Sequence, residues 1–208
     1  MIKNIIFDWD GVINDSLATA YNAIMMIFEK HGAEKMTMEE FKKNWEQPYM
    51  VFFNRYIPHL NKEEVYSEYK TAYRRSASKY PPKPYLNIKE TLQKFKKAQR
   101  SMVIVSSGPP ENILSEIKGF GLQGIFHEVN GAIHDKTEFV KKVLKRNNFS
   151  PGETVFIGDT THEIKAGKSA NIKTGAVTWG FQNEDVLKSA NPDFIIHDLE
   201  ELERTILM

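Results

Sequence analysis

The sequence predicts an α/β fold: a Rossmann-like parallel sheet core with helices on both faces and an inserted α-helical cap domain. The first observation is an apolar run at residues 1–7. The second is a regular alternation of short apolar runs and helical patterns after residue 87, which is typical of right-handed βαβ units around a parallel sheet. The third is a long stretch, residues 16–80, that contains no convincing strand.

The first strand is predicted within residues 1–7, where an Ile- and Phe-rich run meets Asp8 and Asp10 and a Gly-containing loop. Ligands of open α/β sheets bind just beyond such strand ends. A buried carboxylate needs a partner, and a divalent cation would supply one; oxygen ligands favour Mg²⁺. The alternative is that Asp8 and Asp10 are turn and helix-cap residues.

A block of helices is expected next. Apolar residues at helical spacing over 17–28 predict the first helix, which Gly32 ends. Residues 37–40 have the capping-box pattern and open a second. The aromatic-rich stretch 48–56 predicts a short third helix, and a long polar one runs from Asn61 towards Lys79.

Prolines at 81, 82 and 84 break the helical pattern, and strands and helices then alternate. The division predicted is a core of residues 1–15 and 82–208 and a cap of residues 16–81, with hinges near 14–16 and 81–84. The expected strands and apolar runs are 102–105, 125–129, 154–157, 173–178 and 193–196. The expected helices are 87–100, one ending near 118, 137–146, 162–170, 184–190 and 198–206.

Composition narrows the function classes. Among 208 residues, 41% are hydrophobic and 26% charged, as in ordinary soluble globular proteins. A net charge of +1 argues against nucleic acid or an anionic membrane as partner. The absence of cysteine excludes disulfides, thiolate metal sites and a cysteine nucleophile. With no signal-peptide pattern and no stretch near the roughly 18 apolar residues of a membrane span, a cytoplasmic protein is expected.

Polar groups follow four of the predicted core segments, and the carboxyl ends of parallel strands lie on one edge of the sheet. Phosphoryl transfer through an aspartyl intermediate needs such groups: carboxylates for a nucleophile and Mg²⁺, and a lysine, hydroxyls and N–H groups for the phosphate oxygens. The groups are Asp8 and Asp10, then Ser106, Ser107 and Gly108, then Lys136, and finally Asp159 and Glu163.

In these motifs the chain resembles the haloacid dehalogenase superfamily hydrolases with a helical C1-type cap inserted after the first motif. It is similar to their phosphoglycolate phosphatase and β-phosphoglucomutase-like branch, over essentially its whole length. Residues 7–12 (FDWDGV) match the DxDG motif, and 103–106 (VIVS) match the second, a hydrophobic strand ending in Ser or Thr. Lys136 matches the third, and 157–163 (IGDTTHE) match the fourth, GDxxxD, with Glu at the last position.

The resemblance implies a role for each motif residue. Asp8 would be the nucleophile and a metal ligand, and Asp10 the general acid and base, with its main-chain carbonyl on Mg²⁺. Asp159 would ligate the metal directly. Glu163 would lie outside the direct ligands, although its longer arm leaves a direct or a water-mediated contact open. Phosphate binding falls to Ser106, Lys136 and the segment Ser107–Gly108.

Several of these residues also allow simpler interpretations. Lys136 could be a solvated lysine at a helix start. A P-loop is excluded because Asn130 and Asp135 stand at the two positions where that motif requires glycine. His162 is expected at the polar rim of the site. Residues 179–181 (WGF) could border the site or simply pack against the sheet edge.

The predicted function is Mg²⁺-dependent hydrolysis of a small phosphomonoester, with a small phosphorylated metabolite as partner and a monomer or homodimer as assembly. Cap residues expected to contact the substrate are Glu46, Gln47, Tyr49 and Arg55. Only one is basic, whereas a sugar phosphomutase of the β-phosphoglucomutase type needs several cap cations for a second phosphate; Arg74, Arg75 or Lys83 would serve if they faced the core. That mutase and a non-catalytic binding protein of the same fold are the alternatives.

Overall fold

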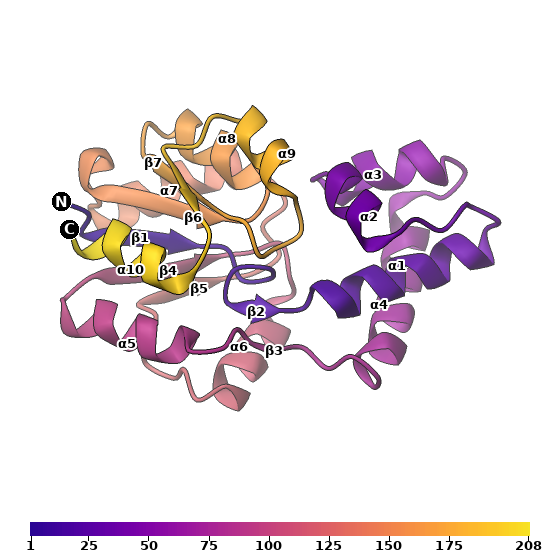
Figure 1. Ribbon diagram of the computed structural model, residues 1–208, viewed down its shortest axis with the longest axis horizontal. Coiled ribbons are helices and arrows are strands. Elements are labelled where there is room, and N and C mark those ends of the chain that lie inside the picture. The colour runs from indigo at the N-terminus through magenta and orange to yellow at the C-terminus, as the bar shows by residue number, and fades with distance from the viewer.

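The computed structural model describes residues 1–208 as two lobes, one built on a sheet and one helical (Figure 1). The sheet has six strands in the order β5-β4-β1-β6-β7-β8, and all neighbours are parallel. This confirms the predicted α/β fold class. The strands are β1 (Asn4–Phe7), β4 (Ser101–Val105), β5 (Glu128–Asn130), β6 (Thr154–Gly158), β7 (Lys173–Val177) and β8 (Phe194–Ile196).

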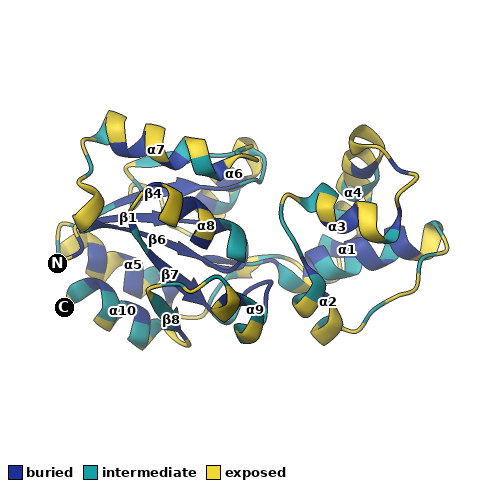
Figure 2. Cartoon of the chain, turned by 90° about the horizontal axis from the view of Figure 1, so that it is seen from above, coloured by how far each residue is buried: buried dark blue, intermediate teal, exposed yellow.

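Helices cover both faces of the sheet because alternate residues of its buried strands point to opposite sides. Ile5 and Phe7 pack into one apolar cluster with α5 (Ile88–Lys97), α6 (Pro110–Gly119) and α10 (Leu199–Leu207). Ile6 packs into the other with α7 (Lys136–Asn147) and α8 (Thr161–Ser169), while α9 (Glu184–Ser189) joins a small cluster with α8 and β7. Buried strands therefore lie between helices whose outer faces are exposed (Figure 2).

The helical lobe consists of α1 (Leu17–Lys30), α2 (Met38–Asn44), α3 (Tyr49–Tyr56) and α4 (Lys62–Ala77), in close agreement with the four helices predicted. A capping box begins α2, as predicted, and a second one, which was not predicted, begins α4. The lobe has its own aromatic core, in which Phe28, Phe41 and Phe52 are fully buried.

Two places connect the lobes. The chain crosses between them at β2 (Asn14–Asp15) and β3 (Lys83–Pro84), which pair antiparallel at the predicted hinge positions. On the other side, the loop after β7 contacts the helical lobe: Gln182 donates to the Trp45 carbonyl, and Asn183 N–H to the Lys42 carbonyl. The β2–β3 ladder was not predicted, since two-residue strands have no sequence periodicity. The division into core and cap at residues 15 and 82 stays a prediction.

Some element bounds differ from the prediction. The fifth strand is 128–130 rather than 125–129, because Ile125 and Phe126 pack against the core from a loop instead of pairing. Helix α5 ends at Lys97 rather than 100, where Gln99 takes a left-handed conformation (φ 58°). Asn87 precedes that helix, also left-handed, but makes no side-chain cap.

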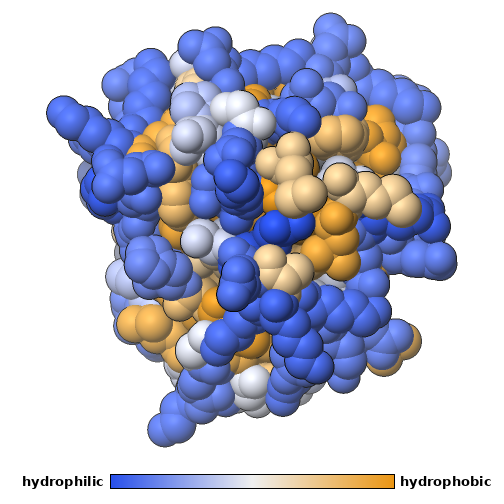
Figure 3. Space-filling model, turned by 90° about the vertical axis from the view of Figure 1, so that its left-hand side faces the viewer, coloured by the Kyte–Doolittle hydropathy of each residue, from blue (hydrophilic) through white to orange (hydrophobic).

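No helix in the structure has the length and apolar character to cross a membrane. Both termini lie at the end of the core lobe away from the helical lobe. The surface at that end is mostly hydrophilic, with some apolar side chains gathered near its centre (Figure 3). Met1 and Met208 are exposed. The polar strand ends face the other way, towards the helical lobe.

Candidate active site

The site is built at the carboxyl edge of three neighbouring strands. Strand β1 lies between β4 and β6, so Asp8, Ser106 and Asp159 follow adjacent strands. The loop after β1 is tight because the Trp9 carbonyl accepts hydrogen bonds from three successive N–H groups, those of residues 12–14. Gly11 has a φ of +78°, and a Cβ there would lie 2.0 Å from Asp159 Oδ2, so only glycine fits.

A buried lysine lies between two carboxylates. Lys136 Nζ donates to Asp8 Oδ2 and to Glu163 Oε1, each at 2.7 Å. Lys136 is the first residue of α7, its side chain is fully buried, and Asp8 is 5% exposed. The alternative that Lys136 is a solvated lysine at a helix start is therefore wrong about its solvation. The second oxygen of Asp8, Oδ1, accepts a hydrogen bond from Trp9 N–H at 2.7 Å.

Glu163 has both oxygens engaged by the protein. Oε1 accepts from Lys136, and Oε2 accepts from the N–H and the hydroxyl of Thr160, at 3.1 and 2.5 Å. The Thr160 contacts form a capping box at the start of α8. Lys136 also holds the pKa of Glu163 below its usual value against the effect of burial. Both Glu163 oxygens therefore have protein partners, and the position of Glu163 outside the direct metal ligands stays a prediction.

Three buried carboxylates could share a cation. Oxygens of Asp8, Asp159 and Glu163 lie within 4.8 Å of one another, with Lys136 as their only basic hydrogen-bond partner. Burial raises the pKa of Asp8 to about 7, and burial together with Glu163 and Asp8 raises the pKa of Asp159. Such an excess of buried negative charge and an all-oxygen donor set fit Mg²⁺. The side chain of Asp10 is outside this group; its predicted ligand atom is the main-chain carbonyl.

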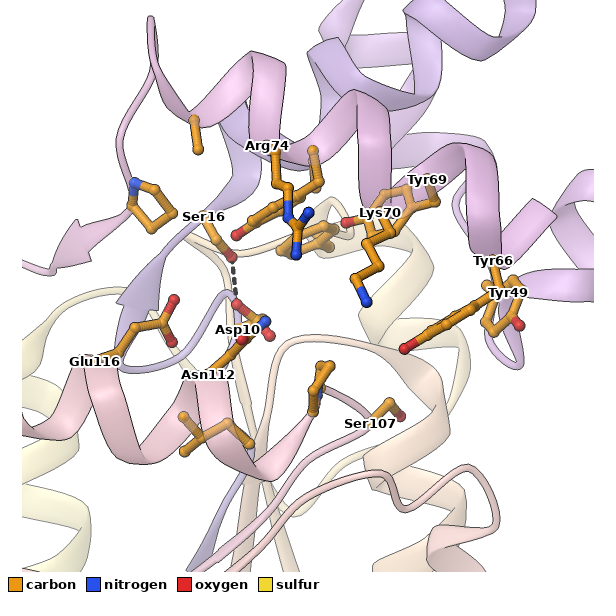
Figure 4. Close-up of a pocket in the computed structure, with 18 of the residues that line it drawn as sticks. Asp10, Ser16, Tyr49, Tyr66, Tyr69, Lys70, Arg74, Ser107, Asn112 and Glu116 are labelled. Atoms are coloured by element: carbon orange, nitrogen blue, oxygen red, sulfur yellow. Dashed lines mark hydrogen bonds between the residues drawn. The ribbon is translucent and has the colours of Figure 1, made fainter. Parts of the chain in front are cut away.

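Asp10 lies at the boundary between the lobes, with its carboxylate on the cavity (Figure 4). Its Oδ1 accepts from Ser16 Oγ at 2.7 Å and from Asn14 Nδ2 at 3.0 Å. Burial raises the pKa of Asp10, and these two hydrogen bonds oppose the rise. The Asp10 carboxylate is therefore oriented by Asn14 and Ser16, which lie where the chain passes from the core lobe to the helical lobe.

The predicted phosphate-binding residues follow β4. Ser106 is buried, and its hydroxyl accepts from Gly108 N–H at 3.1 Å. The Ser107 hydroxyl donates to the Ile133 carbonyl, so it is not free in this structure. A Cβ on Gly108 would lie 3.3 Å from Asp10 Oδ2, which shows how closely this loop approaches the general-acid candidate.

A cavity of about 600 Å³ separates the two lobes above these residues. Asp10, Ser107 and Gly108 line its core side, whereas Asp8, Ser106 and Lys136 are not on its wall and are nearly or fully buried. The cap side is lined mainly by α3 and α4. Among its residues are Tyr49, Tyr66, Tyr69, Lys70, Tyr73 and Arg74.

The predicted cap contacts are partly wrong. Gln47 and Tyr49 line the cavity, but Glu46 and Arg55 do not; they form an exposed ion pair at 2.6 Å. Lys70 was not predicted, and Arg74 only conditionally. The scarcity of cap cations inferred from the sequence is therefore wrong. The spacing of residues 66, 69, 70, 73 and 74 on one helix face was the signal that could have found them.

Other residues near the site are placed as follows. Phe181 both lines the cavity and packs into the aromatic core of the helical lobe, so both interpretations of this segment hold. Its N–H donates to Asp159 Oδ2 at 2.7 Å. His162, expected at the rim, is largely buried, with Nδ1 3.7 Å from Glu163 Oε1. Glu116, which no sequence signal indicated, lines the cavity and accepts from Trp9 Nε1 at 2.6 Å.

Residues 5–177 match the family described as haloacid dehalogenase-like hydrolase. The chain therefore belongs to that family of hydrolases, which confirms the resemblance drawn from its motifs.

The sequence similarity to individual relatives is low, and it covers most of the chain in one case and about half of it in another. It is 24% identical over 210 residues to pyrophosphatase PpaX of Halalkalibacterium halodurans, covering 97% of this chain and 95% of that protein. It is 26% identical over 123 residues to phosphoglycolate phosphatase of Haemophilus influenzae, covering 57% and 55%. A predicted phosphatase from Clostridium acetobutylicum has the same fold: TM-score 0.82 at 20% identity, over 100% and 99% of the two chains.

Proposed function

We propose that the protein is a Mg²⁺-dependent phosphatase that hydrolyses a small phosphomonoester through an aspartyl-phosphate intermediate. The observation that carries the proposal is the buried Asp8–Lys136 pair next to Asp159, directly below a cavity whose core wall holds Asp10. The names of two relatives, a pyrophosphatase and a phosphoglycolate phosphatase, support phosphoryl chemistry.

The first half-reaction forms a bond between an Asp8 carboxylate oxygen and phosphorus. The bond from phosphorus to the ester oxygen breaks, and that oxygen takes a proton from Asp10, leaving as an alcohol. The raised pKa of Asp10, which burial produces, favours the protonated form that this step requires.

The second half-reaction restores Asp8 as a carboxylate and Asp10 as a carboxylic acid. Asp10, now ionised, accepts a proton from water, and the water oxygen attacks phosphorus. The bond between Asp8 and phosphorus breaks, and inorganic phosphate leaves. Ser16 and Asn14 stabilise Asp10 in its ionised form between the two steps, because both donate to its Oδ1.

Lys136, Ser106 and N–H groups of the Ser107–Gly108 segment would hold the phosphate oxygens, and Glu163 orients Lys136. Asp8, Asp159 and the Asp10 carbonyl would hold Mg²⁺, which when bound offsets the negative charge of nucleophile and phosphate. The chain needs that charge because one lysine faces several carboxylates.

A phosphomutase is a second candidate, favoured by one observation. Lys70 and Arg74 give the cavity the cap cations that a second phosphate would require. Detection of an isomerised sugar phosphate, in place of inorganic phosphate, would select this activity.

The test is a panel of phosphomonoesters, including p-nitrophenyl phosphate and phosphoglycolate, assayed for phosphate release with Mg²⁺ and with EDTA. We expect turnover only with Mg²⁺, and none in Asp8→Asn with its circular dichroism unchanged. Activity retained in Asp8→Asn would exclude the mechanism. A folded wild-type protein with no turnover across a broad panel would instead support the non-catalytic alternative.

A further inference from the structure

The cap wall of the cavity carries two cations without partners. Lys70 and Arg74 are one helical turn apart on α4, and both extend into the space opposite Asp10 (Figure 4). Neither forms an ion pair, whereas Arg55 of the same lobe pairs with Glu46. Two neighbouring, accessible, unpaired cations facing a ligand cavity are suited to an anionic group on the ligand.

Aromatic rings surround these cations. Tyr49 comes from α3, and Tyr66, Tyr69 and Tyr73 come from the same face of α4. The rings of Tyr69 and Tyr73 lie 5.5 Å apart, and Tyr66 is 52% exposed. Tyrosine rings offer flat apolar faces that bind planar groups by stacked or edge contacts. A two-carbon phosphate ester such as phosphoglycolate has a single methylene group, which is too small to cover these rings.

The opposite wall carries no lysine or arginine. Its carboxyl groups are those of Asp10, Glu111 and Glu116, so the lysine and arginine that could bind a second anion on the ligand are both on α4. A cavity of about 600 Å³ is equivalent to about twenty waters at roughly 30 Å³ each, and falls within the range of pockets for drug-sized ligands. The cavity therefore has room for a leaving group that reaches from Asp10 to α4.

We infer that the leaving group of the substrate carries a planar aromatic ring and a second negatively charged group. The ring lies among Tyr49, Tyr66 and Tyr69, and the second anion is bound by Lys70 and Arg74. The substrate class is thus an aromatic phosphomonoester with an additional carboxylate or phosphate. This inference rests on the proposed phosphatase function, since the phosphoryl group must face Asp8 for the leaving group to reach the cap.

The test uses four esters that vary charge and ring separately. 3-Carboxyphenyl phosphate and 3-carbamoylphenyl phosphate have similar size and differ in charge, and phosphoglycolate and its amide form the matching pair without a ring. We expect kcat/KM to be about tenfold or more higher for the charged aryl ester than for its amide, because two charge-assisted contacts are lost. We also expect the aryl pair to exceed the glycolate pair.

Substitutions assign the effect to residues. Lys70→Met and Arg74→Met should each reduce the preference for the charged aryl ester and leave kcat/KM for its amide nearly unchanged. Arg75→Met is the matched control, because Arg75 is the adjacent residue of α4, is exposed and does not line the cavity. Tyr66→Ala should weaken both aryl esters and spare both glycolate esters.

Binding separates this inference from the proposed function. Dissociation constants of the aryl pair for Asp8→Asn, measured by calorimetry, do not depend on turnover. Equal constants for the two esters, or an equal loss on both in Lys70→Met and Arg74→Met, would overturn the anion subsite. Equal kcat/KM for aryl and glycolate esters would overturn the ring. A charge preference in binding with no turnover in the wild type would refute the phosphatase and retain the subsite.

Discussion

The two lobes on either side of the cavity differ in how their charges are held. In the core lobe, behind the cavity wall, Lys136 donates at 2.7 Å to both Asp8 and Glu163, and all three side chains are nearly or fully buried. On the cap side, Lys70 and Arg74 are exposed and unpaired. Charges held in a low-dielectric interior interact strongly and need no rearrangement, whereas exposed charges are screened until a ligand covers them. In the proposed function, the core lobe performs the reaction and the helical lobe selects among substrates.

We expect the largest effect from removing the buried cation, Lys136. Lys136→Met removes the only cation shared by buried Asp8 and Glu163, so we expect a loss of about 3–5 kcal/mol in the free energy of unfolding and of at least about 100-fold in kcat. Urea denaturation and steady-state assays measure both. Lys142→Met, an exposed lysine of the same helix, should be neutral. Equal stability of the two variants would mean that the buried pair does not support the fold.

Mg²⁺ should stabilise the folded protein, because it would offset the excess of negative charge in the core lobe. Because Asp8, Asp159 and Glu163 face one lysine, Mg²⁺ at about 100 times its dissociation constant should stabilise the folded state by about 2.7 kcal/mol. Thermal unfolding with Mg²⁺ and with EDTA gives the shift. Asp159→Asn should lose most of it and should unfold at a higher temperature than the wild type in EDTA, since one repulsive carboxylate is gone. A shift of wild-type size in Asp159→Asn would place the metal elsewhere.

Glu116 is intermediate between the buried charges of the core lobe and the exposed cations of α4, since it is half-buried on the cavity wall. Burial and Asp10 raise its pKa to about 7, so the folded state binds a proton there that the unfolded state releases near pH 4.5. Its contribution to stability must therefore fall as pH rises from about 4.5 to about 7. The difference in unfolding free energy between wild type and Glu116→Gln should follow that window. A difference that is independent of pH would show that Glu116 is not protonated preferentially in the fold.

The smallest effect is expected at the exposed ion pair of the helical lobe. Arg55→Met breaks the contact with Glu46, but both side chains are solvated and neither lines the cavity. We expect a change of less than about 1 kcal/mol in stability and no change in kcat/KM. A clear loss of kcat/KM would return Arg55 to the substrate site and weaken the assignment of that role to α4.

The convergence of the candidate site residues could be predicted from the sequence, because the carboxyl ends of parallel strands lie on one edge of the sheet. That Asp8, Ser106 and Asp159 follow three neighbouring strands depends on the strand order, which the structure supplies. The Asp8–Lys136 ion pair and the complete burial of Lys136 could not be predicted, since both depend on how α7 packs against the sheet.

The cap residues that line the cavity were harder to predict from the sequence, for a physical reason. Helix α4 is polar along most of its length, and Val65 is its one fully buried apolar residue, so the hydrophobic pattern hardly indicates which face turns inward. Lys70 and Arg74 therefore looked like ordinary solvated cations. Only the packing of α4 against α1 and the position of the whole lobe above β1 place them on the cavity.

The two-residue ladder of β2 with β3 has a consequence for how the chain accommodates its cap. Asn14 pairs with Pro84 and Asp15 with Lys83, so the insertion leaves and re-enters the core at one point. The entropic cost of closing a loop grows only with the logarithm of its length. Once the β2–β3 ladder forms, a longer insertion therefore adds little to the free-energy cost of folding the sheet. The β2–β3 ladder is thus an insertion point. A helical block of different length or with a different binding surface could be inserted there while Asp8 and Asp10 keep their positions.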